Sequence, residues 1–337
     1  EELTPQGELL KKIWKKLAKG AVIAGSAVGA HIAVNGYLSN QGQFLTSPLP
    51  GKQMLYDWRL GKIWYTAAGS GPPVLLVHGI GAGASSYEWR HNVGPLSEKF
   101  QVFALDLLGF GLSDRPVMNH SGRYYVQLID DFIKGVIGAP TNVIASSHSA
   151  AYAIRLAHTR PERIHTITAI CPMGPDTSAK PSAALEWSAR IVGLPFFGDT
   201  AYHLLTSRAG IARTLREDLY YDAGLVDDAM IDHYYASAHR PGARSAIASF
   251  LRGDMDLGIR EELASIKQPV LIPWGAESIY SPASNARAYQ ELNGRAIVQM
   301  FQGARQLPHD EKADEFNRLV TSWLLPATAD QALRVLS

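Results

Sequence analysis

The stretch VIASSHSAAYAIRLA, residues 143–157, joins an apolar strand to an apolar helix through serines and a histidine. Apolar, largely β-branched residues precede the polar run, and small and apolar residues at helical spacing follow it. In open α/β sheets, the residues just after a strand lie at the carboxyl edge, where ligands bind. The sequence therefore predicts a strand–turn–helix unit with a serine at its corner.

Further strand patterns lie on both sides of this corner. An antiparallel pair is expected to turn at Leu60-Gly61, and long apolar runs are typical of strands that are buried on both faces of a parallel sheet. The eight expected strands cover residues 54–59, 62–68, 73–79, 102–111, 142–147, 164–172, 269–275 and 296–303. Helical patterns separate most of them, which predicts an α/β fold with a doubly wound, mostly parallel eight-stranded sheet.

One interval interrupts this alternation. Residues 173–264 contain no clear core strand and carry many aromatic residues at helical spacing. A structureless loop of that length is uncommon in a compact domain. We therefore expect an inserted helical lid at 173–264, an α/β core formed by 51–172 and 265–328, and an N-terminal helix and linker at 1–50.

Composition restricts the function. The chain has 337 residues, 46% of them hydrophobic, and its 32 basic and 31 acidic residues nearly balance, so nothing favours nucleic acid as a partner. The single cysteine, Cys171, excludes an internal disulfide and a multi-cysteine metal site. There is no Walker loop and no H-E-x-x-H motif, so we expect no metal and no other cofactor.

The N-terminus combines charge with an apolar segment. Five lysines lie between residues 11 and 19, and an apolar segment follows at 21–38 that contains Ser26, His31 and Asn35, each unfavourable in hydrocarbon. Three interpretations remain open: a helix at a membrane surface with its lysines on the cytoplasmic side, a secretory signal, and a helix packed on its own domain. We expect a cytoplasmic location, and in the first interpretation residues 1–38 contact a membrane.

The corner resembles the nucleophile elbow, G-x-S-x-G, of the α/β-hydrolase superfamily when it is read in the frame Ser147-His148-Ser149-Ala150-Ala151. Residues 73–89, PVLLVHGIGAGASSYEW, resemble the strand and His-Gly turn of that superfamily, and residues 105–116, LDLLGFGLSDRP, resemble the segment after its next strand.

This resemblance implies an α/β-hydrolase fold and a set of site residues. Ser149 would be the nucleophile, and the backbone amides of Ile80 and Ala150 would form the oxyanion hole.

The positions of the base and acid depart from the family pattern. The family's histidine turn reads G-A-G-H-x-P-H-x-E, whereas residues 303–311 read GARQLPHDE and place Gln306 at the base position. A glutamine amide cannot accept a proton in catalysis. At the position of the acid, the family's aspartate is replaced by Ser278.

Several residues could compensate. The leading hypothesis makes His309 the base, with Glu277 or Asp310 as its orienting carboxylate. His148 lies next to Ser149 on a sharp turn where neighbouring side chains diverge, and His78 is expected to support the His-Gly turn. Asp176 is an alternative acid.

These residues predict a serine hydrolase. The expected reaction is hydrolysis of an ester or related acyl bond in a small or lipid-like apolar substrate, through an acyl-enzyme on Ser149 and a non-standard base. The alternative is a non-hydrolytic protein of the same fold that binds a ligand or acts as a lyase or isomerase. A membrane-attached scaffold is a third hypothesis.

Overall fold

A computed structural model describes residues 29–30, 32–38, 42, 45–176, 190–194 and 197–325 of the chain. Most of the N-terminal segment lies outside these residues, including all its lysines. Residues 32–38 are helical. In the described part of the chain, no helix combines the length and apolar character that crossing a bilayer requires.

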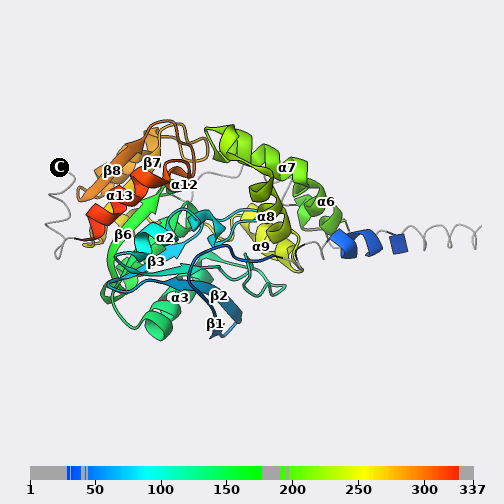
Figure 1. Ribbon diagram of the computed structural model, residues 1–337, viewed down its shortest axis with the longest axis horizontal. Helices are drawn as coiled ribbons and strands as arrows, with labels where there is room; N and C mark the ends of the chain where they lie inside the picture. Colours follow the sequence, from blue (N-terminus) through cyan, green and yellow to red (C-terminus); the bar gives the residue numbers. More distant parts are fainter. Residues whose placement is uncertain are drawn as a thin grey trace, which may run out of the picture.

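A single eight-stranded sheet organises the molecule (Figure 1). Its strands are β1 (Lys52–Trp58), β2 (Gly61–Ala68), β3 (Pro73–Val77), β4 (Gln101–Leu105), β5 (Thr141–Ser146), β6 (Ile164–Ile170), β7 (Val270–Gly275) and β8 (Ala296–Phe301). Their order is β1-β2-β4-β3-β5-β6-β7-β8, with β2 antiparallel to both of its neighbours and all later pairs parallel. The predicted fold class is confirmed.

Burial explains the strand sequences. All residues of β5 and β7 are buried, because helices cover both faces of the sheet. The flanking helices are α2 (Val93–Ser97), α3 (Gly122–Phe132), α4 (His148–Thr159), α11 (Ser284–Leu292), α12 (Pro308–Glu311) and α13 (Ala313–Leu324). Cys171 is buried directly after β6, and burial raises the pKa of its thiol to about 12. The thiol is therefore protonated at neutral pH and packs as a small apolar group.

Helices occupy the chain between β6 and β7, and no described residue between these two strands belongs to a strand. They are α6 (Gly198–Leu205), α7 (Arg208–Arg213), the π-helix η5 (Thr214–Leu219), the short 3-10 helix η6 (Ala223–Leu225), α8 (Asp228–Ala238), α9 (Ala243–Leu251) and α10 (Arg260–Ser265). We call this segment the helical insertion. Helices η5 and α8 share a small apolar cluster of their own, which also includes Leu307 of the core.

The insertion lies against the carboxyl ends of the parallel strands. The amide of Gln306, after β8, donates to Leu219 O at 3.1 Å. A Cβ on Gly83, after β3, would lie 2.4 Å from Tyr234 O, so α8 packs directly on that loop. The insertion therefore borders the sheet edge at which the elbow turn lies.

Candidate active site

Ser147 forms the turn between β5 and α4, and its backbone is strained. Its φ is 54° and its ψ is −122°, in a region that residues other than glycine rarely adopt. Its amide donates to Ile170 O at 2.9 Å, which holds the turn against β6. A strained serine between a buried strand and a helix is the geometry of a nucleophile elbow. Ser147 is half-buried, so part of it remains accessible.

The prediction that Ser149 is the nucleophile is wrong in register. Ser149 lies within the first turn of α4 and is fully buried, and its hydroxyl donates to His78 O at 2.6 Å. The motif frame is therefore Ala145-Ser146-Ser147-His148-Ser149, in which Ala145 and Ser149 are the small residues that the tight turn requires. The hydroxyl of Ser149 ties α4 to the His-Gly turn and cannot reach a substrate.

The His-Gly turn lies beside the elbow. A Cβ on Gly79 would approach Ser147 Cβ to 3.6 Å, so the two turns pack closely. With Ser147 at the corner, the amide that follows it belongs to His148. The amide of Ala150 donates within the helix to Ser147 O at 3.2 Å, so its prediction as an oxyanion donor is wrong. Ile80 follows Gly79 directly and stays the predicted second donor.

The His148 imidazole lies between Ser147 and a carboxylate of the insertion. Its Nδ1 is 3.4 Å from Ser147 Oγ, and its Nε2 is 3.1 Å from Asp256 Oδ1. The Phe250 ring meets the imidazole edge-on, with centroids 5.1 Å apart. An Nε2–H that donates to Asp256 leaves the Nδ1 lone pair directed toward the serine hydroxyl. The three side chains thus form a serine–imidazole–carboxylate series.

Sequence reasoning placed His148 among the candidates but did not favour it. The expected divergence concerned His148 and Ser149, and these side chains do point apart, because the Ser149 hydroxyl donates to His78 O. The imidazole of His148 instead faces the hydroxyl of Ser147. Asp256 lies between α9 and α10 and belongs to no recognisable motif. Only the packing of the insertion brings it to the elbow.

Gln306 and Ser278 contact each other in the fold. The Ser278 hydroxyl donates to Gln306 Oε1 at 2.7 Å, and Gln306 Nε2 donates to Cys171 O at 3.0 Å. Both side chains are buried, and Cys171 has a φ of 38°. The amide of Gln306 thus uses both of its polar ends to hold a strained backbone, and it has no capacity to act as a base.

His309 is fully buried, and the prediction that it is the base is wrong. Its ring packs on Trp89, with centroids 4.5 Å apart, and its Nε2 faces Glu88 Oε1 at 3.5 Å. Glu88 Oε2 in turn accepts from the amide of Gly79 at 3.1 Å. The family motif places this histidine three residues beyond the base position, where α12 begins and its side chain points into the core.

The three predicted carboxylates also have other partners. Glu277 Oε2 accepts from the amide of Ala304 at 3.1 Å. Asp310 pairs with Arg90 at 2.8 Å and accepts from a tyrosine hydroxyl of the insertion, that of Tyr220.

Asp176 forms a bidentate pair with Arg260, both distances being 2.7 Å. These contacts do not support the predictions that Glu277, Asp310 or Asp176 orients a base.

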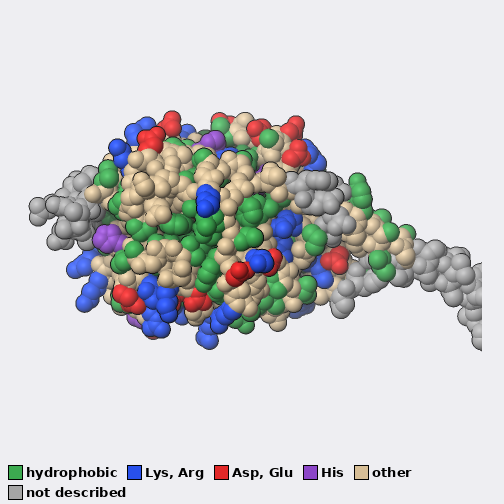
Figure 2. Space-filling model, turned by 60° about the horizontal axis from the view of Figure 1, so that its bottom comes forward, with side chains coloured by type: hydrophobic (Ala, Val, Ile, Leu, Met, Phe, Trp, Pro, Cys, Tyr) green, Lys and Arg blue, Asp and Glu red, His purple; other side chains and the backbone are tan. Residues whose placement is uncertain are grey.

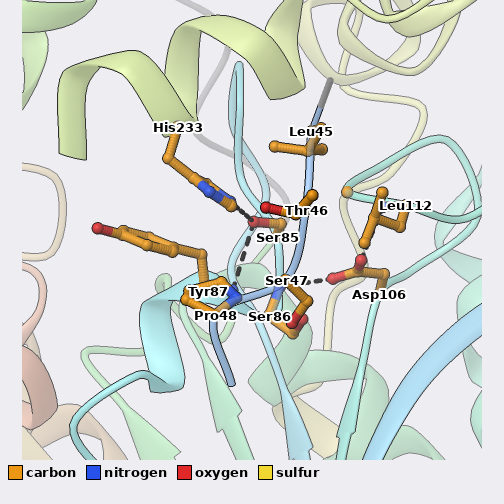
Figure 3. Close-up of a pocket in the computed structure, with 11 residues that line it drawn as sticks. Leu45, Thr46, Ser47, Pro48, Ser85, Ser86, Tyr87, Asp106, Leu112 and His233 are labelled. Carbon is orange, nitrogen blue, oxygen red and sulfur yellow. Dashed lines mark hydrogen bonds between the residues drawn. The ribbon is translucent and has the colours of Figure 1, made fainter. Parts of the chain in front are cut away.

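A small polar cavity lies nearby, between α8 and the linker that precedes β1 (Figure 3). In it, His233 Nε2 lies 3.3 Å from Ser85 Oγ, and the imidazole stacks on Tyr87. Burial lowers the pKa of His233 to about 4, so the ring is neutral at pH 7 and can accept the serine hydroxyl. The cavity volume is about 10 Å³, enough for one water molecule and no substrate.

A second, larger cavity of about 960 Å³ lies between the helix of residues 32–38, α6 and α9. Ser147 lines neither of the two cavities.

A comparison with known protein families identifies the family to which this chain belongs. The sequence profile of the α/β-hydrolase fold matches residues 72–313, which include the elbow, the His-Gly turn and the insertion. The chain belongs to the α/β-hydrolase fold family.

Relatives within the family are distant. The chain is 26% identical to the dihydrolipoyllysine-residue acetyltransferase component of the acetoin cleaving system of Cupriavidus necator, over 78% of this chain and 66% of that protein. It is also 26% identical to a 2-hydroxy-6-oxo-6-(2'-aminophenyl)hexa-2,4-dienoic acid hydrolase of Metapseudomonas resinovorans, over 68% of this chain and 75% of the relative.

A solved serine hydrolase involved in carbazole degradation superposes with a TM-score of 0.67 at 20% identity, covering 80% of this chain and 97% of that one. This likeness supports the fold. The named hydrolases among the relatives support an enzyme of the hydrolase class for this α/β-hydrolase member.

Proposed function

We propose that this α/β-hydrolase fold protein hydrolyses an ester or related acyl bond, with Ser147 as nucleophile, His148 as base and Asp256 as the carboxylate that orients the imidazole. The observation that carries the proposal is the series of contacts from Ser147 Oγ to His148 Nδ1 at 3.4 Å and from His148 Nε2 to Asp256 at 3.1 Å. Catalytic hydrogen bonds are often long in the absence of substrate, so 3.4 Å is compatible with this role.

The chemistry follows from the contacts. Ser147 Oγ attacks the acyl carbon while its proton passes to His148 Nδ1, and the resulting imidazolium is paired with the Asp256 carboxylate. The amides of Ile80 and His148 would stabilise the oxyanion. When the tetrahedral intermediate collapses, the leaving alcohol takes the proton from Nδ1. A water molecule then attacks the acyl-enzyme with His148 again as base, which releases the acid and restores the serine.

We infer a small or lipid-like apolar acyl substrate. Support comes from Phe250, whose ring packs on His148, and from a relative whose named substrate carries an aminophenyl ring. The helical insertion would act as a lid, because it supplies Asp256 and borders the sheet edge beside Ser147.

One observation favours a second candidate function. Gln306 and Ser278, which stand at the positions predicted for the base and the acid, form a neutral, hydrogen-bonded pair. A protein that binds an apolar ligand without hydrolysing it could retain the fold and lose acyl transfer in this way.

Turnover of chromogenic acyl esters by matched serine variants separates the two functions. We expect Ser147→Ala to remove hydrolysis and Ser149→Gly to keep most of it, because Ser149 stands at a position that the family fills with glycine. The Ser149 variant loses one buried hydrogen bond, which costs about 1 kcal/mol of stability. No turnover by the wild-type chain, together with retained ligand binding, would favour the binding protein. Activity that survives in Ser147→Ala would contradict the assigned nucleophile.

A further inference from the structure

The helix of residues 32–38 carries apolar side chains that face solvent. Ile32 is 61% exposed and Val34 is 56% exposed. The helix lies beside α6, since Asn35 Nδ2 donates to Thr200 Oγ1 at 3.1 Å (Figure 1). An apolar helix that belonged to the domain core would bury these side chains. Packing on its own domain therefore does not explain the composition of residues 32–38.

Helix α6 extends this apolar surface. Leu204 and Leu205 are 74% and 55% exposed. Thr200 and Leu204 are four residues apart, so Leu204 lies on the side of α6 that contacts the N-terminal helix. Figure 2 shows some of the hydrophobic side chains at the surface of the described part of the projecting arm. We define the apolar face as six exposed aliphatic residues of this helix, of α6 and of the segment before α6: Ile32, Val34, Ile191, Leu194, Leu204 and Leu205.

The opposite side of α6 is anchored. The Tyr202 hydroxyl donates to Ala238 O at 2.8 Å, and the His203 ring stacks on His239 with centroids 4.9 Å apart. Both contacts join α6 to the end of α8. Because α6 is fixed on this side, Leu204 and Leu205 cannot turn inward without breaking buried contacts. Their exposure is a property of the packed insertion.

The charge of the N-terminal segment indicates which kind of surface the apolar face contacts. Five lysines lie between residues 11 and 19, shortly before the apolar helix, although the chain as a whole has a net charge of only +1. Basic residues next to exposed leucines and isoleucines are the combination that binds an anionic lipid surface, where lysines meet headgroups and apolar side chains enter the acyl boundary.

We propose that the apolar face docks onto an anionic lipid bilayer, so that α6 of the helical insertion enters the membrane interface. The sequence-based expectation assigned membrane contact to residues 1–38 alone. This surface adds α6 and the segment before it, and it is independent of the hydrolase reaction.

A single fluorescent probe on the full chain tests the contact. Cys171 is buried and is the only cysteine, so a cysteine introduced at Leu204 can be labelled selectively with an environment-sensitive dye. Leu55→Cys on β1 is the matched control, since Leu55 is 51% exposed and lies outside the face. With vesicles that contain phosphatidylglycerol, we expect a blue shift of the dye at Leu204 and none at Leu55. The same response at both positions, or at neither, would overturn the proposal.

Binding strength is tested by vesicle co-sedimentation. We expect the double variant Leu204→Asp, Leu205→Asp to bind phosphatidylglycerol vesicles about tenfold more weakly than wild type, and Leu55→Asp to bind as wild type. Turnover of a water-soluble ester should be the same in all three proteins, which separates this proposal from the proposed activity. If the double variant instead abolished a concentration-dependent dimer and left vesicle binding intact, the face would be an interface between two copies and the lipid proposal would be wrong.

Discussion

At the residue scale, the candidate site depends on two neighbouring residues with different constraints. The strained backbone fixes Ser147, whereas the imidazole of His148 can rotate about its own side-chain bonds. Asp256 and the edge of Phe250 restrict that rotation. A carboxylate of the insertion therefore decides whether the base faces the serine, so Asp256 is a positioning residue for the reaction.

Replacing Asp256 tests this dependence. We expect Asp256→Asn to lower kcat for ester hydrolysis by roughly 10²-fold to 10⁴-fold, as loss of a triad carboxylate does, with little change in KM. The control is Asp254→Asn in the same loop, where the carboxylate pairs with Arg252 at 2.7 Å and does not contact the imidazole. Steady-state kinetics of the two variants decide the point, and equal kcat values would refute the role of Asp256.

The residue scale is also where prediction from sequence was least accurate. One strand–helix corner contains Ser146, Ser147 and Ser149, and small residues flank more than one of them. The elbow motif can therefore be aligned with the sequence in more than one frame. Strand and helix periodicity do not specify which residue takes the positive φ, because that strain is imposed by the packing of β5, β6 and α4. The predicted frame was therefore shifted by two residues.

At the scale of elements, the segment after β8 makes packing contacts and supplies no group to the proposed reaction. Gln306 donates through its side-chain amide to Cys171 O and through its backbone amide to Leu219 O. Leu307 packs into the apolar cluster of the insertion. The strands and their order follow from long apolar runs and were predictable. The role of this segment was only partly predictable. The sequence indicated that the base position holds Gln306 and no histidine, but it did not indicate what Gln306 contacts.

The close packing of β7 against the segment after β8 can be tested by a substitution at Gly275. A Cβ at Gly275 would lie 1.7 Å from Arg305 O, a contact that backbone atoms cannot relieve locally. We expect Gly275→Ala to lower the free energy of unfolding by about 2 to 3 kcal/mol. Gly294→Ala is the control, since nothing lies within 4 Å of its Cβ. Urea unfolding that gave the same loss for both variants would show that the segment is loosely packed.

At the scale of the whole molecule, the insertion and the core are joined by polar contacts between residues that lie far apart in the sequence. His148 meets Asp256, Ser85 meets His233, and Asp310 accepts from Tyr220. The sequence predicted a helical segment at this place from its length and aromatic content. It could not predict these pairs, because each forms only when the insertion folds back on the sheet edge.

Buried histidines make the insertion sensitive to acid. Burial lowers the pKa of His203 and of His233 to about 4, and it also lowers the pKa of His239. Between about pH 6.5 and pH 4 the unfolded chain therefore binds more protons than the folded one, so stability falls as the pH falls.

We expect the free energy of unfolding to decrease by about 1 to 2 kcal/mol for each of His203 and His233 from pH 6.5 to pH 5. His233→Gln should lessen this decrease. Denaturant unfolding at the two pH values provides the measurement, and an unchanged or greater stability at the lower pH would contradict the burial of these rings.

The central claim is that Ser147 carries the activated hydroxyl. Its most direct test is to treat the full chain with a fluorophosphonate and to locate the adduct by mass spectrometry of the peptide that spans residues 143–157. The account predicts one adduct, on Ser147, that disappears in Ser147→Ala and persists in Ser149→Gly. An adduct on Ser149, or none on the wild-type chain, would contradict it.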